Sequence, residues 1–391
     1  MEKHLYYDVV IVGTGVSGLY TALHLSKEKK ILLICKEGIN ECDSMLAQGG
    51  ICVMRDENDY NDFLEDTMRA GHYENRKESV EVMIESSRRI INELLELGVK
   101  FEKNSDGSLK YTKEGAHSKS RICFCKDITG KEITETLQKH VKKMHNVTIM
   151  EYVTMTDLLI KNEECCGIVA ESSDLKKDIY YIHTQDTVLA TGGIGGLYEH
   201  TTNFSCLTGD ALVIAHKYGI RLESVDYVQI HPTTLYQENK GRSFLISESA
   251  RGEGAVLLNN KGERFVSELL PRDVVTQKIY EEMKKENSKC VWLSFENIPS
   301  NVIVEHFPNI YRTCLEAGYD IMKESIPVVP AQHYFMGGIY VDLDSKTTME
   351  HLYAVGETSC NGVHGKNRLA SNSLLESLVF AGRSADKIEK R

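Results

Sequence analysis

Two stretches at opposite ends of the chain have the composition of a site for a large anionic ligand. Near the C-terminus, residues 364–377 combine a basic turn, which contains Arg368, with the start of a helix. An arginine suits a carboxylate, and the free N–H groups at a helix start suit an anionic or electron-rich ligand. Near the N-terminus, an apolar segment runs into a glycine-rich turn over 13–18. We therefore expect one bipartite flavin pocket, closed by distant parts of the chain.

Five polar residues, each in a segment bounded by glycine or proline, could bind a substrate and act on it. They are Glu114, His231, Arg272, His333 and Arg368. Arginine forms forked, charge-assisted bonds with carboxylates, two histidines add donors for a second carboxylate, and a glutamate attracts an ammonium group. Taken singly, each residue has an ordinary alternative: a satisfied core histidine, a local ion pair or a solvated carboxylate. As a set, they favour a small dicarboxylate that carries an amine.

The elements that must position these residues begin with a βαβ unit. The apolar pattern predicts a strand over 6–12, a helix over 15–29 and a second strand over 31–35. Between the first strand and the helix lie three glycines in the order G-x-G-x-x-G, which permit a tight turn and close approach to a pyrophosphate. This context predicts a dinucleotide site but does not separate FAD from NAD.

The end of the second strand lacks the acidic residue that usually binds a ribose. Cys35 and Lys36 occupy that place, and Glu37 follows late. This weakens an NAD assignment and leaves the FAD ribose contact open. The small residues over 44–50 would let the backbone lie against a flat ring, although a plain glycine turn is an equal alternative.

The rest of the chain continues the α/β pattern, except for one proline-containing region. Further elements are expected as helices over 61–70, 78–97 and 133–144, and as strands over 186–190 and 352–355. All six prolines lie between 224 and 334, which we interpret as an inserted second domain. The predicted division is therefore 1–223 and 335–391 for the dinucleotide fold and 224–334 for the insertion.

Composition narrows the function classes. The 391 residues carry a net charge of −11, with 41% hydrophobic and 26% charged residues, so nucleic acid is not expected as a partner. No apolar run reaches the ~20 residues that a membrane span needs, and no signal peptide is apparent, so we expect a cytoplasmic protein without a membrane partner. The 11 cysteines lack zinc-site spacing, which predicts reduced thiols and no metal.

These motifs resemble the flavoprotein family of succinate dehydrogenase and fumarate reductase. The similarity spans almost the whole chain and rests on the motifs Gly13-x-Gly15-x-x-Gly18, Ala47-Gln48-Gly49-Gly50, His231-Pro232-Thr233, Ala250-Arg251-Gly252-Glu253-Gly254, Pro271-Arg272-Asp273 and Asn367-Arg368-x-x-x-Asn372-Ser373-Leu374-Leu375-Glu376. The segments 114–118 and 329–334 are most similar to the members that oxidise L-aspartate in the first step of NAD biosynthesis.

The resemblance implies an α/β fold in which a Rossmann-like FAD-binding domain carries an inserted α+β capping domain. It implies that Glu114, His231, Ser247, His333 and Arg368 bind the substrate and that Arg272 is the proton donor or acceptor. Together with the glycine motif and the C-terminal helix start, it predicts the following FAD contacts: Gly13, Thr14, Gly15, Val16, Ser17, Gly18, Lys36, Asp43, Ser44, Met45, Leu46, Ala47, Gln48, Gly49, Gly50, Asp210, Glu357, Ser371, Ser373 and Leu374.

Three departures from the family pattern carry expectations of their own. Many members link FAD covalently through a histidine just before the Ala-Gln-Gly-Gly turn, where this chain has Asp43, so we expect non-covalent FAD. The chain stops at Arg391, so the C-terminal helical domain of the family is expected to be absent. Ser247 stands where threonine is usual, and it keeps the hydroxyl.

The expected reaction is hydride transfer from Cα of L-aspartate to flavin N5, which gives iminoaspartate. Fumarate or O2 would reoxidise the flavin, and quinolinate synthase is a candidate partner for the unstable product. Arg272 could act as a base only beside carboxylates, for which Glu253 and Asp273 are the candidates. Two alternatives stay open: a soluble fumarate reductase or succinate dehydrogenase-type flavoprotein, and an FAD-binding protein without catalysis.

Overall fold

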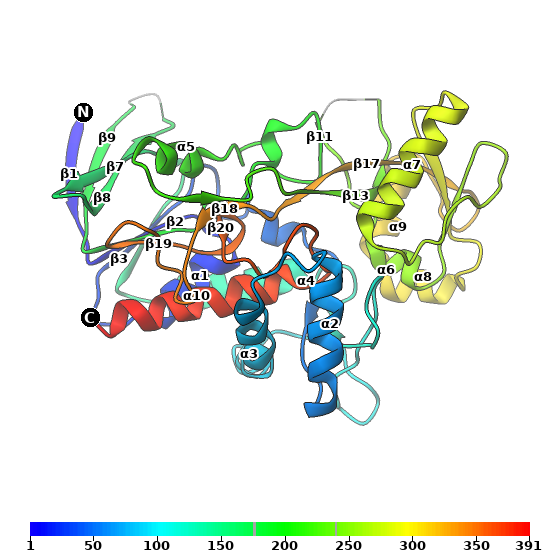
Figure 1. Ribbon diagram of the computed structural model, residues 1–391, viewed down its shortest axis with the longest axis horizontal. Coiled ribbons are helices and arrows are strands. Elements are labelled where there is room, and N and C mark those ends of the chain that lie inside the picture. Colours follow the sequence, from blue (N-terminus) through cyan, green and yellow to red (C-terminus); the bar gives the residue numbers. More distant parts are fainter. Residues whose placement is uncertain (175–176, 239–240) are drawn as a thin grey trace.

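A five-stranded parallel sheet forms the centre of the larger part of the molecule. The computed structural model describes residues 1–174, 177–238 and 241–391 (Figure 1). The strands, in sheet order, are β19 (Leu352–Ala354), β10 (Asp186–Leu189), β2 (Val9–Val12), β3 (Ile31–Ile34) and β6 (Val147–Met150). All neighbours are parallel, and every residue of β2 and β3 is buried, as expected for strands covered on both faces.

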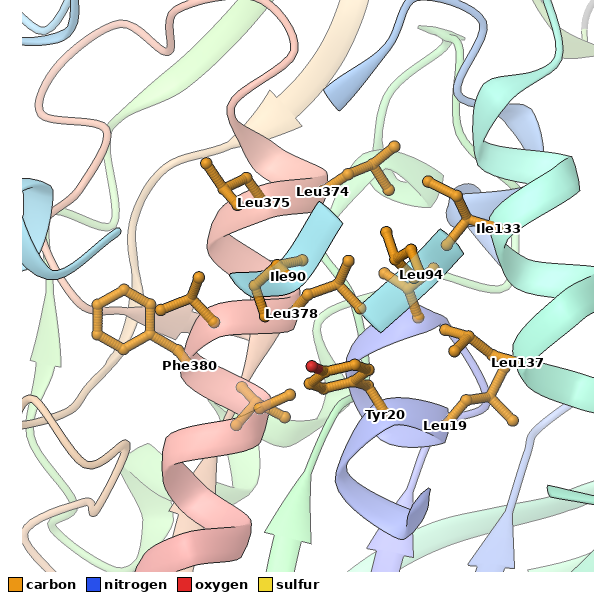
Figure 2. Close-up of a cluster of buried hydrophobic side chains, with 14 of the residues drawn as sticks. Leu19, Tyr20, Ile90, Leu94, Ile133, Leu137, Leu374, Leu375, Leu378 and Phe380 are labelled. Carbon is orange, nitrogen blue, oxygen red and sulfur yellow. The ribbon is translucent and has the colours of Figure 1, made fainter. Parts of the chain in front are cut away.

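Helices cover one face of this sheet. They are α1 (Val16–His24), α3 (Lys77–Glu96), α4 (Thr129–Val141) and α10 (Ser373–Glu389). Figure 2 shows Leu19 of α1, Leu137 of α4 and Leu378 of α10 in one buried cluster. The helix predicted over 15–29 ends at His24, because Leu25 is extended and the charged residues after it form a turn.

The opposite face carries a second sheet that the sequence analysis did not resolve. Its order is β1 (Glu2–Tyr6), β9 (Ile179–His183), β8 (Glu164–Ser172) and β7 (Val153–Lys161). The strand predicted over 6–12 is wrong at its start, since Tyr6 ends β1 in this second sheet and the central strand begins at Val9. Helix α5 (Asp210–Lys217) packs beside β7, and both sheets share a buried cluster.

A mixed sheet with its own buried cluster forms a separate end of the molecule, at the right of Figure 1. Its strands are β14 (Gly241–Arg242), β11 (His200–Thr201), β17 (Ile326–Phe335), β16 (Val291–Ser294), β15 (Val256–Leu258) and β13 (Val228–Leu235), which pairs with β17. Its helices are α6 (Glu248–Gly252), α7 (Arg272–Glu286), α8 (Ser300–His306) and α9 (Pro308–Glu316). Most of it lies within 224–334, although β11 joins this sheet from outside that range.

Shorter elements connect the two parts. They are η1 (Asp43–Leu46), β4 (Ile51–Cys52), η2 (Glu57–Asp59), α2 (Tyr60–Ala70), β5 (Ile122–Cys123), η3 (Gly195–Leu197), β12 (Leu222–Glu223), β18 (Gly338–Tyr340), η4 (Gly356–Thr358) and β20 (Ser359–Cys360). Among the described residues, no helix is both long and apolar enough to cross a membrane, and no group of His, Cys, Asp or Glu could hold a metal ion.

A buried arginine fixes the loop that carries Glu114. Arg121 is fully buried and pairs with Asp59 at 2.9 Å and with Asp66 at 2.7 Å. The Asp66 carboxylate also accepts hydrogen bonds from the backbone N–H and hydroxyl of Ser118. Residues 112–121 are thereby tied to α2, so the position of the loop depends on these buried charges.

We predict that Arg121→Ala lowers the free energy of unfolding by about 3–5 kcal/mol, because two buried carboxylates lose their counter-charge. Thermal unfolding of the holoprotein would measure the loss. Arg88→Ala is the matched control, since Arg88 and its partner Glu57 are exposed and such pairs contribute about 0–1 kcal/mol. Equal losses in the two variants would contradict the prediction.

Candidate active site

One large cavity lies where the central sheet, the η1 segment and the mixed sheet meet. Its volume is about 860 Å³, near the upper end for small-molecule sites. All six residues expected to act on or bind the substrate line it: Glu114, His231, Ser247, Arg272, His333 and Arg368. Every residue expected to contact FAD lines it too, with the exception of Gly18.

The glycine motif forms the turn between β2 and α1 at one end of the cavity. Gly13 has a φ of +118°, and a Cβ there would lie 2.0 Å from the carbonyl oxygen of Ala190. Gly18 faces away from the cavity, and a Cβ on it would lie 2.1 Å from the carbonyl oxygen of Gly13. Its role is therefore close packing of the helix against the turn, which leaves contact with a ligand to the rest of the motif.

Segment 43–50 follows the cavity wall, held by bonds from two directions. The backbone N–H of Val16 donates to Ser44 Oγ at 3.1 Å, and that of Gly130 donates to the carbonyl of Ala47 at 2.9 Å. A Cβ at Gly49 would lie 2.5 Å from Glu114 Oε1. A Cβ at Gly50 would lie 2.4 Å from the carbonyl oxygen of Cys123, so packing favours glycine at both positions.

Lys36 follows the second strand of the βαβ unit, at the place where an acidic residue usually binds a ribose. Lys36 Nζ pairs with Asp210 Oδ2 at 2.9 Å and donates to Thr208 Oγ1 at 2.9 Å. Glu37 lines the cavity as well, although it comes late after the strand. A carboxylate from α5 thus reaches this end of the cavity from a different part of the chain.

Two half-buried carboxyl groups, those of Asp43 and Glu357, line the cavity. Burial and their mutual repulsion raise the pKa of Glu357 to about 8, and burial raises that of Asp43 to about 7. Asp43 Oδ1 accepts the backbone N–H of Phe204, while its buried Oδ2 has no partner. Glu357 accepts the backbone N–H of Phe335 at 2.9 Å. At least one of these groups is therefore neutral near pH 7 and able to donate a hydrogen bond.

The carboxylate partner of Arg272 is Glu248, which the sequence analysis missed. Arg272 Nε donates to Glu248 Oε2 at 2.6 Å, and its Nη1 donates to Gln229 Oε1 at 2.9 Å. The expected partners were wrong: Glu253 pairs with His306 and Asp273 pairs with His72. Arg272 begins α7, which directs the adjacent Asp273 elsewhere, whereas Glu248 opens α6 only one residue after Ser247.

The pKa of both histidines of the site is lowered, which favours the neutral imidazole. Burial, helped by the Arg272 charge, lowers the pKa of His231 well below its usual range, and burial with the Arg368 charge does the same for His333. His333 Nδ1 bonds Thr202 Oγ1 at 2.8 Å. His231 Nδ1 lies 3.2 Å from the backbone N of Thr233 and 3.1 Å from its carbonyl oxygen, and its buried Nε2 has no partner. In the tautomer that accepts the Thr233 N–H at Nδ1, the imidazole carries its proton on Nε2, where it can donate to a ligand.

Arg368 lies just before α10, with part of its guanidinium uncommitted. Its Nη1 donates to Ser373 Oγ at 3.0 Å, the guanidinium carbon lies 4.6 Å from the ring centre of Tyr334, and the buried Nε has no partner. Burial and the nearby charge of Arg272 lower its pKa to about 10. The residue therefore remains a cation at neutral pH and can take up a buried carboxylate.

Glu114 is buried and hydrogen-bonded on both oxygens. Its Oε1 accepts from Ser249 Oγ at 2.8 Å, and its Oε2 accepts from Ser371 Oγ at 2.6 Å. Burial and the charge of Glu248 raise its pKa. The sequence analysis missed Ser249 as a partner of Glu114. The available signal was its position, two residues after the predicted site residue Ser247.

The cavity fits a flavin dinucleotide. A side chain at Gly13 or Gly49 would strike its walls, and buried polar atoms of Asp43, His231 and Arg368 lack protein partners. It also joins a glycine turn at one end to two arginines at the other. The fold and the cavity together define an FAD-binding flavoprotein. Residues 8–374 match the family described as FAD binding domain, and FAD is the cofactor.

Comparison with known proteins specifies the family further. The chain is 51% identical to L-aspartate oxidase of Clostridium perfringens, a match that covers 97% of this chain and 86% of that one. It is 50% identical to L-aspartate oxidase of Clostridium acetobutylicum over 97% of this chain and 87% of that one. The fold is similar to an E. coli quinol fumarate reductase chain, with a TM-score of 0.92 and 29% identity over 99% of this chain and 70% of that one. The chain belongs to the L-aspartate oxidase family.

We predict that Gly13→Ala yields protein with about tenfold less bound FAD or none, because the methyl group strikes the Ala190 carbonyl. The ratio of flavin to protein absorbance after gel filtration measures this. Gly98→Ala is the matched control: it also has a positive φ, of +100°, but nothing lies within 4 Å of the added carbon. That variant should keep its FAD and lose only about 1 kcal/mol of stability. Full FAD in Gly13→Ala would contradict the prediction.

Proposed function

We propose that this protein oxidises L-aspartate to iminoaspartate with non-covalently bound FAD, in the first step of NAD biosynthesis. One observation carries the proposal: a buried carboxylate, Glu114, lines the same cavity as two arginines and two neutral histidines. That set can bind two carboxylates and one ammonium group at once. The similarity to relatives named L-aspartate oxidase supports it.

The two carboxylates of the substrate would bind at adjacent subsites, since the His231 and His333 ring centres lie 5.1 Å apart. Arg368 and His333 would hold one through the free guanidinium Nε and an imidazole proton. His231 Nε2 and the Ser247 hydroxyl would hold the other. Ser247 is the N-cap of α6, where its oxygen accepts the backbone N–H of Ser249, and this fixes the hydroxyl in place.

The ammonium group would bind Glu114. Both oxygens of this carboxylate accept serine hydroxyls, so it is held in one orientation and cannot turn towards Arg272. A dicarboxylate without an amine would leave this buried acid without a counter-charge. Glu114 therefore selects aspartate over succinate.

Proton exchange would belong to Arg272. Bound FAD would supply the redox chemistry, as acceptor of a hydride from Cα of the substrate and donor of two electrons to fumarate or O2. The short ion pair with Glu248 orients the guanidinium, and although burial acts to raise the pKa of Glu248, the charges of Arg272 and Arg251 lower it. A proton lost from the substrate on oxidation, or one added to fumarate when fumarate reoxidises the flavin, would pass through this pair.

A soluble fumarate reductase is the second candidate function. The backbone similarity to fumarate reductases favours it, with TM-scores of 0.92 and 0.93 for two such chains. Both functions use a four-carbon dicarboxylate at one site, so the amine-binding Glu114 discriminates between them. Succinate should leave the bound flavin oxidised, whereas a succinate oxidase would be bleached by it.

Three further assignments belong to this proposal. The inserted unit, 224–334, acts as a cap that closes over the substrate, and the two flanking ranges, 1–223 and 335–391, bind FAD. The absence of a histidine between Lys36 and Gly50 supports non-covalent attachment. Iminoaspartate hydrolyses readily, so a cytoplasmic quinolinate synthase would be its consumer.

Anaerobic titration of the holoprotein with L-aspartate tests the function directly. We expect loss of the flavin absorbance in the wild type, and an unchanged spectrum on titration in Arg272→Leu, which should still hold FAD. Arg264→Leu is the matched control, because Arg264 is an exposed arginine of the same unit and pairs with Glu268. An oxidised wild-type flavin under saturating L-aspartate would exclude the proposed reaction, and normal bleaching of Arg272→Leu would remove the role of Arg272.

We predict that Glu114→Gln raises KM for L-aspartate by about 10–100-fold, because a charge-assisted bond worth about 1.5–3 kcal/mol is lost. The KM for fumarate, which has no ammonium group, should change much less.

Because the pKa of Glu114 is raised, the wild-type carboxylate takes up a proton at a higher pH than an ordinary glutamate, and KM for aspartate should rise as pH falls through that pKa. Steady-state kinetics at several pH values should show this rise in the wild type and not in Glu114→Gln. The same dependence of KM on pH in both proteins would contradict the assignment.

A further inference from the structure

One buried carboxylate of the FAD-binding part reaches into the inserted unit. Asp127 lies between β5 and α4, and its Oδ2 accepts the backbone N–H of Ile310 at 2.7 Å. Ile310 is in the first turn of α9, where the backbone N–H groups have no partner within the helix. A side chain from one unit thus caps a helix of the other.

The surroundings of Asp127 make this contact more than a surface hydrogen bond. The residue is 2% exposed, and its other oxygen, Oδ1, is buried without a partner. Burial raises its pKa to about 6, so the carboxylate is ionised at neutral pH and faces the positive end of the α9 dipole. Pro308 at the start of α9 has no N–H of its own, which leaves the following amides for the carboxylate.

The same loop holds the turn that faces the flavin. Two residues beyond Asp127, Thr129 Oγ1 donates to the carbonyl of Gly49 at 2.7 Å. The next residue, Gly130, donates its N–H to the carbonyl of Ala47 at 2.9 Å. A continuous path of bonds therefore runs from α9 through residues 127–130 to the 47–50 turn, whose Gly49 packs against Glu114.

Helix α9 is also part of the cavity wall. Pro308, Asn309, Arg312 and Thr313 line the cavity together with Asp127 and Ile128. A movement of α9 away from residues 127–128 would open this wall and would break the hydrogen bond from Ile310 to Asp127.

We propose that Asp127 is a positioning residue that holds the inserted unit closed over the substrate and couples this closure to the flavin-facing turn. The proposal rests on the proposed function in one respect, that the cavity holds flavin and a dicarboxylate. Asp127 acts through the α9 amide that it caps. Its effect is on the fraction of molecules in which the cavity is closed, and a ligand that needs the closed form binds more weakly by that fraction.

Kinetics of the FAD-loaded variants test the first half of the proposal. Loss of a helix-capping side chain costs about 1 kcal/mol, so Asp127→Ala should raise KM for L-aspartate about fivefold. Because the closed complex is unchanged, kcat should fall less than twofold. Asp127→Asn keeps an acceptor oxygen and should restore most of the affinity. Asp320→Ala is the control, since Asp320 accepts the N–H of Met322 within the inserted unit and spans no boundary.

Hydrogen exchange of the same holoproteins, read by mass spectrometry, tests the coupling. Asp127→Ala should increase exchange in peptides covering 308–316 and 44–52, and Asp320→Ala should leave both unchanged. Faster exchange confined to 308–316 would overturn the coupling, and no change in either peptide would overturn the proposal as a whole. This readout needs no turnover. If L-aspartate left the wild-type flavin oxidised, the proposed function would be refuted. The role of Asp127 could still be measured by hydrogen exchange.

Discussion

The site depends on a balance of buried charge. Arg272, Arg368 and Glu248 are each less than a tenth exposed, and Glu114 is buried beside them. Isolated ions would be strongly destabilised at such a depth, so their positions are set by one another. The Arg272–Glu248 pair neutralises one cation internally, and Arg368 stays available for a ligand carboxylate. A substrate with two carboxylates and one ammonium group completes this pattern, which is why the cavity suits an amino diacid.

Neutral histidines are a consequence of the same balance. Burial and the charges of nearby arginines lower the pKa of both His231 and His333, which favours their neutral forms. Each therefore offers directional hydrogen bonding without adding positive charge. A site with four cations would bind dicarboxylates tightly but would release a dicarboxylate product slowly. The observed set combines two full charges with two neutral donors.

Much of the fold could be predicted where one periodicity dominated. The strand–turn–helix at Val9–His24 and helix α10 follow from continuous apolar patterns and the glycines between them. The antiparallel sheet of β7, β8 and β9 could not be predicted, since its strands are half-buried and mix Thr, Glu, Cys and Tyr without strict alternation. In the site, single residues were identified by motif, but Glu248 was missed because its pairing with Arg272 spans 24 residues and depends on how α6 meets α7.

Packing of the last helix against the first has a consequence for how the protein is made. Helix α10 contributes Leu374, Leu375, Leu378 and Phe380 to the core beneath the β2–α1 unit, and α1 and α10 touch along much of their length (Figure 2). The nucleotide-binding turn near the N-terminus therefore lacks its hydrophobic support until residues 373–389 have left the ribosome. Contacts so distant in sequence form late. We therefore expect flavin to bind tightly only once α10 has packed against α1.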